Sequence, residues 1–111
     1  MRLLKELLKN HETVWIYCEK DMQEHFLKKA EEEGFHTRQG ESPTTLEPNH
    51  LYALNQDMTL GYLSNIVWYL AHQTGDTTHL KIDYAKFITG EADYQSHGSH
   101  IKSVEFREVK A

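Results

Sequence analysis

The stretch TVWIYCEKDMQEHFLKKAEEEG, residues 13–34, decides the fold class of this chain. Its first part, residues 13–18, is rich in β-branched and aromatic side chains without helical spacing, which is typical of a buried strand. Asp21 and Glu24 then have the spacing of a helix capping box, and Gly34 is placed to end the helix. The stretch therefore predicts a strand followed by an amphipathic helix.

The remaining elements follow from the spacing of apolar residues on either side of this stretch. Residues 35–38 are predicted to form a second strand parallel to the first, because the intervening helix makes a crossover connection. Apolar residues at helical spacing predict a helix over 62–72 that is buried on more than one side. The other predicted elements are an amphipathic helix over 1–10, a hairpin with strands over 51–55 and 58–62, and a strand over 78–84.

Together these elements predict an α+β (or α/β) fold with a mixed sheet of four to six strands and two or three helices. A chain of 111 residues is long enough for one core, so residues 1–111 are predicted to form a single domain. Within it we expect an N-terminal amphipathic helix over 1–10 and an α/β core over 13–84. An irregular segment with a last strand is predicted over 85–111.

The overall charge limits the classes of partner. Seventeen Asp and Glu against twelve Lys and Arg give a net charge of −5, which repels polyanions and makes direct binding of nucleic acid unfavourable. No apolar run reaches the roughly 20 residues of a membrane helix, and the N-terminus does not resemble a secretory signal. A single cysteine, Cys18, rules out an internal disulfide and is expected to be a core residue. These features predict a cytoplasmic protein that does not bind a membrane.

Few side chains form a pattern that indicates catalysis. His97 and His100 follow Asp93, and two histidines with a carboxylate can hold a metal. Gly98 separates the two histidines and no apolar period supports a helix there, so we expect an exposed loop and no metal. Because phosphate-binding, nucleophile-elbow and dinucleotide motifs are also missing from the sequence, we expect a protein that is not an enzyme and needs no cofactor.

The candidate binding residues fall in three places. Glu24, Glu31 and Glu32 make one face of the predicted helix acidic. The long loop over residues 39–49 contains both prolines, and surface loops frequently contact partners. The full set of predicted binding residues is Glu24, Glu31, Glu32, Glu41, Tyr52 and Tyr62, the two tyrosines being expected to lie exposed on the hairpin.

Three segments carry a resemblance: IYCEKDMQEHFLKKAEEEGFHTRQGESPT (16–44), HLYALNQDMTLGYLS (50–64) and HLKIDY (79–84). Their order of a Tyr-Cys strand, a capped helix, a Gly-Glu-Ser loop and a hairpin resembles small uncharacterised proteins of bacterial phages and mobile elements. Anti-CRISPR-type inhibitors of host defence occur in that group. The resemblance implies a phage or mobile-element context and transfers no active site.

Three functions remain open from the sequence. The first is a non-enzymatic protein that inhibits a host defence protein, such as a CRISPR nuclease, by stoichiometric contact. The second is a pocket protein that binds or hydrolyses a nucleotide or cyclic dinucleotide between Tyr52, Tyr62 and His50. The third is a small metal-dependent enzyme that uses His97 and His100. A homodimer is compatible with all three.

Overall fold

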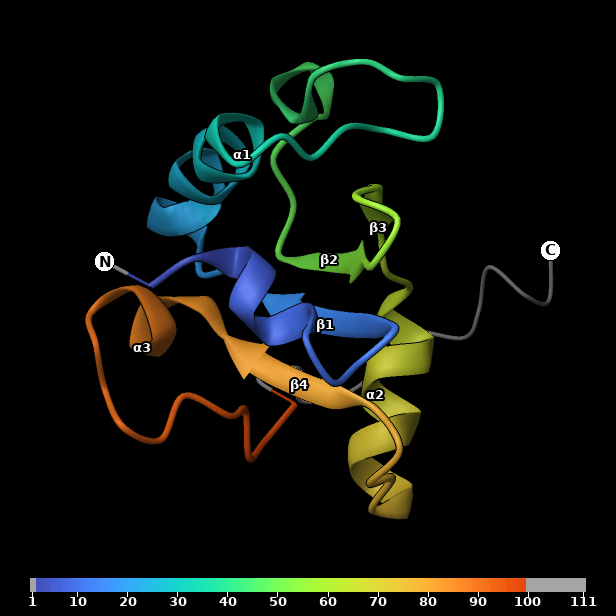
Figure 1. Ribbon diagram of the computed structural model, residues 1–111. Coiled ribbons are helices and arrows are strands. Elements are labelled where there is room, and N and C mark those ends of the chain that lie inside the picture. The colour runs from blue at the N-terminus through green and yellow to red at the C-terminus, as the bar shows by residue number, and fades with distance from the viewer. Residues whose placement is uncertain (1, 100–111) are drawn as a thin grey trace, which may run out of the picture.

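The structure is a computed structural model that describes residues 2–99 (Figure 1). Three α-helices, three short 3₁₀ helices and four strands are formed in this range. In chain order they are η1 (Leu4–Leu8), β1 (Thr13–Tyr17), η2 (Lys20–Met22), α1 (Gln23–Glu32), η3 (Pro43–Thr45), β2 (Leu51–Asn55), β3 (Leu60–Tyr62), α2 (Asn65–Thr74), β4 (Leu80–Asp83) and α3 (Tyr84–Ile88).

The four strands form one mixed sheet in the order β3-β2-β1-β4. β1 pairs antiparallel with β2, with Trp15 opposite Ala53, and β2 pairs antiparallel with β3. On its other edge β1 pairs parallel with β4, which aligns Ile16 with Ile82. The predicted α+β fold, a single domain with a mixed sheet and three α-helices, is confirmed.

The strand predicted over residues 35–38 is wrong. Gly34, at φ +93°, turns the chain after α1, and His36 then makes one isolated bridge to Thr59 beside the hairpin. Both edges of β1 are already occupied, by β2 and by β4. The parallel neighbour of β1 is therefore β4, reached through a long connection that contains α1, the hairpin and α2.

The predicted capping box of α1 does not form. Residues 20–22 make a 3₁₀ turn before the helix, closed by the N–H of Met22 donating to the carbonyl of Glu19 at 2.8 Å. Asp21 lies inside this turn, and no side chain caps the first residues of α1. The C-terminal prediction is confirmed, because Gly34 takes a left-handed conformation and the N–H of Phe35 closes onto the carbonyl of Ala30.

The larger core lies on the sheet face covered by α1, η1 and α3. Phe26 of α1 is fully buried there and stacks on Tyr52 with ring centroids 4.9 Å apart. The N-terminal helix is shorter than predicted. It is the 3₁₀ helix η1, which covers Leu4–Leu8. The buried apolar residues of this core are Leu4, Leu7, Leu8, Val14, Ile16, Cys18, Phe26, Leu27, Ala30, Phe35, Tyr52, Leu54, Leu60, Ile82, Tyr84 and Phe87.

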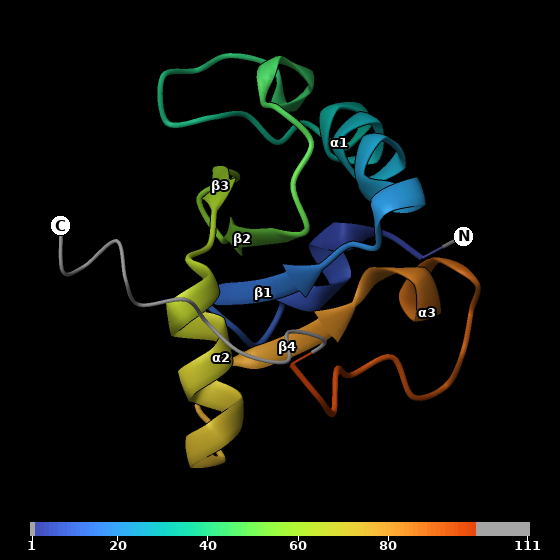
Figure 2. The ribbon, with the colours of Figure 1, turned by 180° about the vertical axis from the view of Figure 1, so that it is seen from behind.

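α2 covers the opposite face of the sheet through a smaller core (Figure 2). Trp68 is fully buried there with Trp15, Leu51 and Ala71. The prediction that this helix is buried on more than one side is wrong, because its outer face is open to solvent. Only one layer of the molecule packs against α2, so its second apolar face has nothing to cover it among the described residues.

The chain after β4 begins with α3, which was not predicted. The bridge between Ile82 and Gln95 then brings the chain back to the edge of β4. The predicted last strand near residues 104–106 lies outside the described residues. Of the helices in the described range, none has the length and apolar character that crossing a membrane requires.

Candidate functional site

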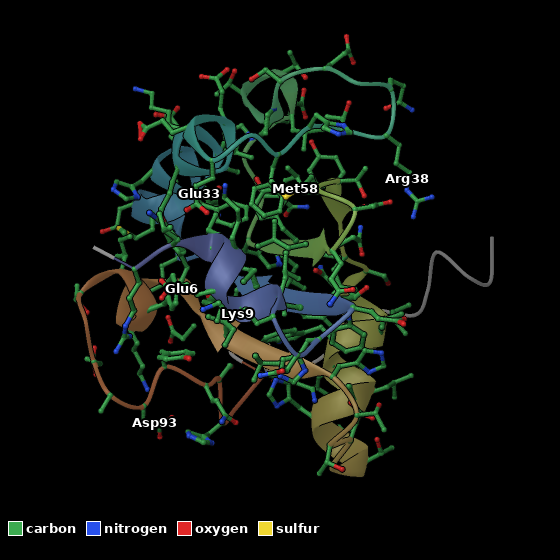
Figure 3. All side chains as sticks on the ribbon, viewed as in Figure 1. Glu6, Lys9, Glu33, Arg38, Met58 and Asp93 are labelled. Carbon is green, nitrogen blue, oxygen red and sulfur yellow. The ribbon has the colours of Figure 1, made fainter. Side chains whose placement is uncertain are left out.

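The exposed side of α1 carries the glutamates Glu24, Glu31 and Glu32 together with Lys28. Lys29 turns inward and pairs with Glu33, with the Lys29 Nζ 3.3 Å from Glu33 Oε2 and both side chains less than a tenth exposed. Glu33 also accepts hydrogen bonds from the N–H groups of Leu4 and Lys5, and Figure 3 shows it between α1 and the N-terminal turn. This pair therefore removes one lysine and one glutamate from the surface and leaves Lys28 as the exposed lysine of α1.

Glu31 ties the long loop to α1. Its carboxylate accepts hydrogen bonds from the hydroxyls of Ser42 and Thr44, the latter at 3.2 Å, and Ser42 caps η3. Pro43 of η3 is buried, and η3 packs against α1. Of the predicted binding residues, Glu31 thus serves partly to hold the loop, while Glu24 and Glu32 stay exposed on the same helix.

Tyr52 and Tyr62 fix the other end of the loop. The hydroxyl of Tyr62 donates to the carbonyl of Glu47 at 3.0 Å, and the hydroxyl of Tyr52 accepts from the N–H of Asn49 at 2.7 Å. Tyr62 is about half exposed, as predicted, whereas Tyr52 is fully buried and cannot be the surface contact that was expected. Burial raises the pKa of Tyr52 to about 12, so its hydroxyl keeps its proton at neutral pH.

We expect Tyr52→Phe to lower the free energy of unfolding by about 1–2 kcal/mol, because it leaves the partly buried N–H of Asn49 without its acceptor. Amide exchange at Asn49 should accelerate as the loop loosens. Tyr62→Phe is the matched control, and because that side chain is half exposed its effect should stay within about 0.5 kcal/mol. Urea denaturation of the two variants measures the difference, and equal losses would contradict the anchoring role of Tyr52.

A groove separates α1 from the anchored loop, and we call it the α1–loop groove. It has a volume of about 280 Å³ and is lined by Glu24, Leu27, Lys28, Thr44, Leu46 and Pro48. Leu27 is buried and Leu46 partly buried, whereas the two charged residues are exposed. The groove is therefore apolar between the helix and the loop and carries Glu24 and Lys28 at its rim.

Glu41 lies away from the groove, in the turn at the far end of the loop. The N–H of Glu41 donates a hydrogen bond to the Thr37 hydroxyl at 3.1 Å. Arg38 lies in the same turn and points away from the body of the molecule in Figure 3. An acidic and a basic side chain are thus both exposed at this end of the loop. The structure gathers Glu24, Glu31 and Glu32 on one surface and leaves Glu41 at its margin.

The pocket expected around Tyr52, Tyr62 and His50 is not formed by those three residues. A larger hollow of about 620 Å³ lies where β1 ends and α2 begins, and only His50 of the three lines it. There His50 Nε2 is 3.0 Å from the side-chain oxygen of Asn65. The complete lining is Tyr17, Lys20, Gln23, Pro48, Asn49, His50 and Asn65, most of which the sequence did not single out as ligand contacts.

His97 and Asp93 form an exposed pair, with His97 Nε2 2.7 Å from Asp93 Oδ2. The hydrogen bond from His97 lowers the pKa of Asp93 below its usual value. Among residues 2–99, no group of three His, Cys, Asp or Glu side chains is arranged to hold a metal. His100, the other histidine of the predicted cluster, lies outside the described residues.

Cys18 is fully buried at the end of β1, in the core position that the sequence predicted. Burial, with a smaller contribution from the charge of Asp83, raises the pKa of its thiol well above the usual value. A thiol that attacks a substrate needs the opposite shift. The environment of Cys18 is that of a packing residue.

A second hollow, of about 510 Å³, lies between the end of α2 and β4 and has His11, His72, His79 and His97 among its lining residues. Asp76 is the main polar partner in this hollow. Its Oδ2 lies 3.1 Å from Nζ of Lys81, and the side chain of Lys81 is almost fully buried. The hydrogen bond from the Thr78 hydroxyl, with further ones from Lys81 and His79, holds the pKa of Asp76 well below its usual range.

The lowered pKa of Asp76 predicts a loss of stability in acid. A carboxyl with a depressed folded-state pKa stabilises the fold above its unfolded pKa of about 3.9, and this contribution disappears as the pH falls below that value. We expect Asp76→Asn to lose less stability than the wild type between about pH 5 and pH 2. Thermal unfolding across this range, with Asp21→Asn as an exposed control, measures the effect. Parallel pH profiles for wild type and Asp76→Asn would contradict it.

Comparison with known proteins adds no relative: no family model, curated protein or solved structure matches the chain.

Proposed function

We propose that this protein is a non-enzymatic binding protein that inhibits its target by stoichiometric contact through α1 and the loop. The observation that carries the proposal is the α1–loop groove, in which apolar side chains lie between the helix and the loop, with Glu24 and Lys28 exposed at the rim. Glu31 and Glu32 are also exposed on α1, so the exposed glutamates of this helix outnumber its exposed lysine, Lys28. A charged rim around an apolar groove is a combination that protein interfaces use.

The chemistry of this surface defines the partner. A groove of about 280 Å³ holds one or two apolar side chains, and the glutamates beside it favour Lys or Arg on either side of them. The anchoring of both loop ends by Glu31, Tyr52 and Tyr62 means that the groove exists before the partner arrives. A preformed site loses less conformational entropy on binding.

The resemblance to phage and mobile-element proteins places a bacterial defence protein first among partners, with a CRISPR nuclease as the leading class. Such nucleases present basic surfaces to nucleic acid, which an acidic protein of net charge −5 is suited to cover. The same net charge makes direct contact with nucleic acid unfavourable. Because these targets act inside the bacterial cell, the proposal also places the protein in the cytoplasm.

Affinity capture from bacterial lysate tests this proposal. The wild-type protein should retain a protein with a basic surface, in an amount near that of the bait, and should release it as the salt concentration rises. Glu24→Lys/Glu32→Lys should retain none. Equal capture by wild type and by this variant would overturn the proposed surface.

The hollow beside His50 supports a second proposal, a small polar ligand such as a nucleotide. Its lining of amide side chains with Lys20, Tyr17 and His50 offers several hydrogen-bond donors and a ring on which a base can stack. A thermal-shift screen against nucleotides and cyclic dinucleotides distinguishes the two functions, because a ligand that binds only the folded state raises the melting temperature. No shift with any of them would remove this alternative.

A further inference from the structure

One long stretch of this charged protein has no charged side chain. Charged residues make up 26% of the chain, yet residues 58–75 contain no Asp, Glu, Lys or Arg. This stretch includes β3 and all of α2. Loss of charge together with aromatic and aliphatic side chains is the composition found at the centre of protein interfaces.

The outer face of α2 carries an apolar stripe. Ile66 and Val67 lie four and three residues before Leu70, so these three side chains share one side of the helix, whereas Leu63 precedes the helix and packs against the smaller core. Val67 is 44% exposed and Leu70 is 47% exposed, and Tyr62, beside the start of the stripe, is 49% exposed. These are three of the four large exposed hydrophobic side chains found in residues 2–99. Contiguous exposure of this kind marks an interaction site.

We propose that this stripe binds the same stripe on a second copy of the chain, forming a symmetric homodimer. The net charge of the chain is the reason to expect a second copy as the partner of this stripe. A second copy also carries net charge −5, so acidic faces such as that of α1 repel each other when two copies meet. The α2 face has no charged side chain to oppose, and Asp76 at its end is paired with Lys81. An acidic protein can therefore meet its own copy through α2 at little electrostatic cost.

The geometry of α2 suits a two-fold interface. In antiparallel pairing about an axis between Val67 and Leu70, Val67 packs against Leu70 of the partner subunit, and the same contact is repeated by symmetry. The opposed helix dipoles also attract each other in this arrangement. Figures 1 and 2 both show α2 extending away from α1, although its first residue, Asn65, lies beside His50 at the end of the loop. No residue of α2 lines the α1–loop groove, so the dimer leaves the groove uncovered.

Sedimentation equilibrium of the full chain over a range of concentrations tests the dimer. The wild type should approach twice the chain mass of 13.0 kDa, and raising the salt concentration should not dissociate it, because no ion pair holds the interface. Val67→Glu should weaken association by at least about tenfold, since it places two carboxylates across the two-fold axis. This salt response is opposite to that expected for the proposed partner, so failure of one proposal is distinguishable from failure of the other.

Two further variants make the test specific. Leu3→Glu, at a side chain 46% exposed on the N-terminal segment, is the matched control and should dimerise like the wild type. An equimolar mixture of Val67→Glu and Val67→Lys should recover the dimer, because the two charges then attract across the axis. A wild type that is monomeric at every concentration would overturn the proposal. So would a Val67→Glu variant that keeps the dimer, or a mixture that fails to recover it.

Discussion

Replacing Phe26 by alanine is expected to lower the free energy of unfolding by about 3–5 kcal/mol, the largest stability change predicted for this chain. The ring is fully buried between α1 and the sheet. It stacks on Tyr52 at 4.9 Å and meets Tyr84 edge-on at 5.2 Å. Removing it leaves a cavity that this aromatic cluster cannot close, because its other members are fixed on β2 and on α3. Urea denaturation followed by circular dichroism measures the loss.

The matched control for Phe26→Ala is Lys28→Ala, on the exposed side of the same helix. It changes helix propensity little and should alter stability by no more than about 0.5 kcal/mol. Because Phe26 holds α1 to the sheet, its loss should also loosen the loop that Glu31 ties to α1. A loss below about 1 kcal/mol for Phe26→Ala would show that α1 does not depend on this cluster.

Reversing two charges on α1 is expected to have the largest effect on binding. Glu24→Lys/Glu32→Lys should weaken the complex with the captured partner by at least about a hundredfold, or about 2.7 kcal/mol. Each substitution replaces an attraction to a basic partner by a repulsion at the same place. Both side chains are exposed, so the fold and the melting temperature should remain unchanged. Fluorescence anisotropy or calorimetry with the purified partner measures the change.

The control for net charge is Glu12→Lys/Glu91→Lys. Both side chains are exposed and neither lies on α1 or on the loop, and the total change in charge is the same. This variant should bind the partner within a few-fold of the wild type, because only long-range steering is affected. If it weakens binding as much as the α1 variant does, the protein acts through its overall charge and not through a defined surface.

The elements that could be predicted from the sequence are those that short-range patterns determine. The β-branched and aromatic residues of β1 form a strand because they pack well on a pleated surface, and the tight connection after β2 makes a hairpin. The helix predicted over 62–72 forms as α2, but it begins three residues later than predicted because Ser64 caps its first turn, and Gly75 takes the left-handed conformation that ends it.

The pairing of β1 with β4 could not be predicted in the same way. Strand neighbours are chosen by long-range packing, and residues 35–38 have only Phe35 to offer the core at the point where a neighbour was expected. The capping box failed for a local reason, because the turn at residues 20–22 places Asp21 inside a 3₁₀ helix. A spacing that is compatible with a cap does not determine where the helix starts.

The candidate surface was predicted in part. An acidic helix beside a long loop was visible in the sequence, and the structure brings Glu24 and the loop together around one groove. The inward turn of Lys29 could not be inferred, because it depends on Glu33 and on the N-terminal turn packed beside it. The open face of α2 was missed because helical spacing identifies an apolar face without showing what covers it.

The central claim is that the protein inhibits its partner by occupying a surface, without turnover. The most direct test is a titration in which the partner's activity is measured against increasing amounts of the purified protein. We predict that activity falls linearly to zero at a fixed molar ratio and that longer incubation does not change this ratio. Inactivation of many partner molecules by one molecule of the protein, progressing with time, would contradict the account and indicate catalysis.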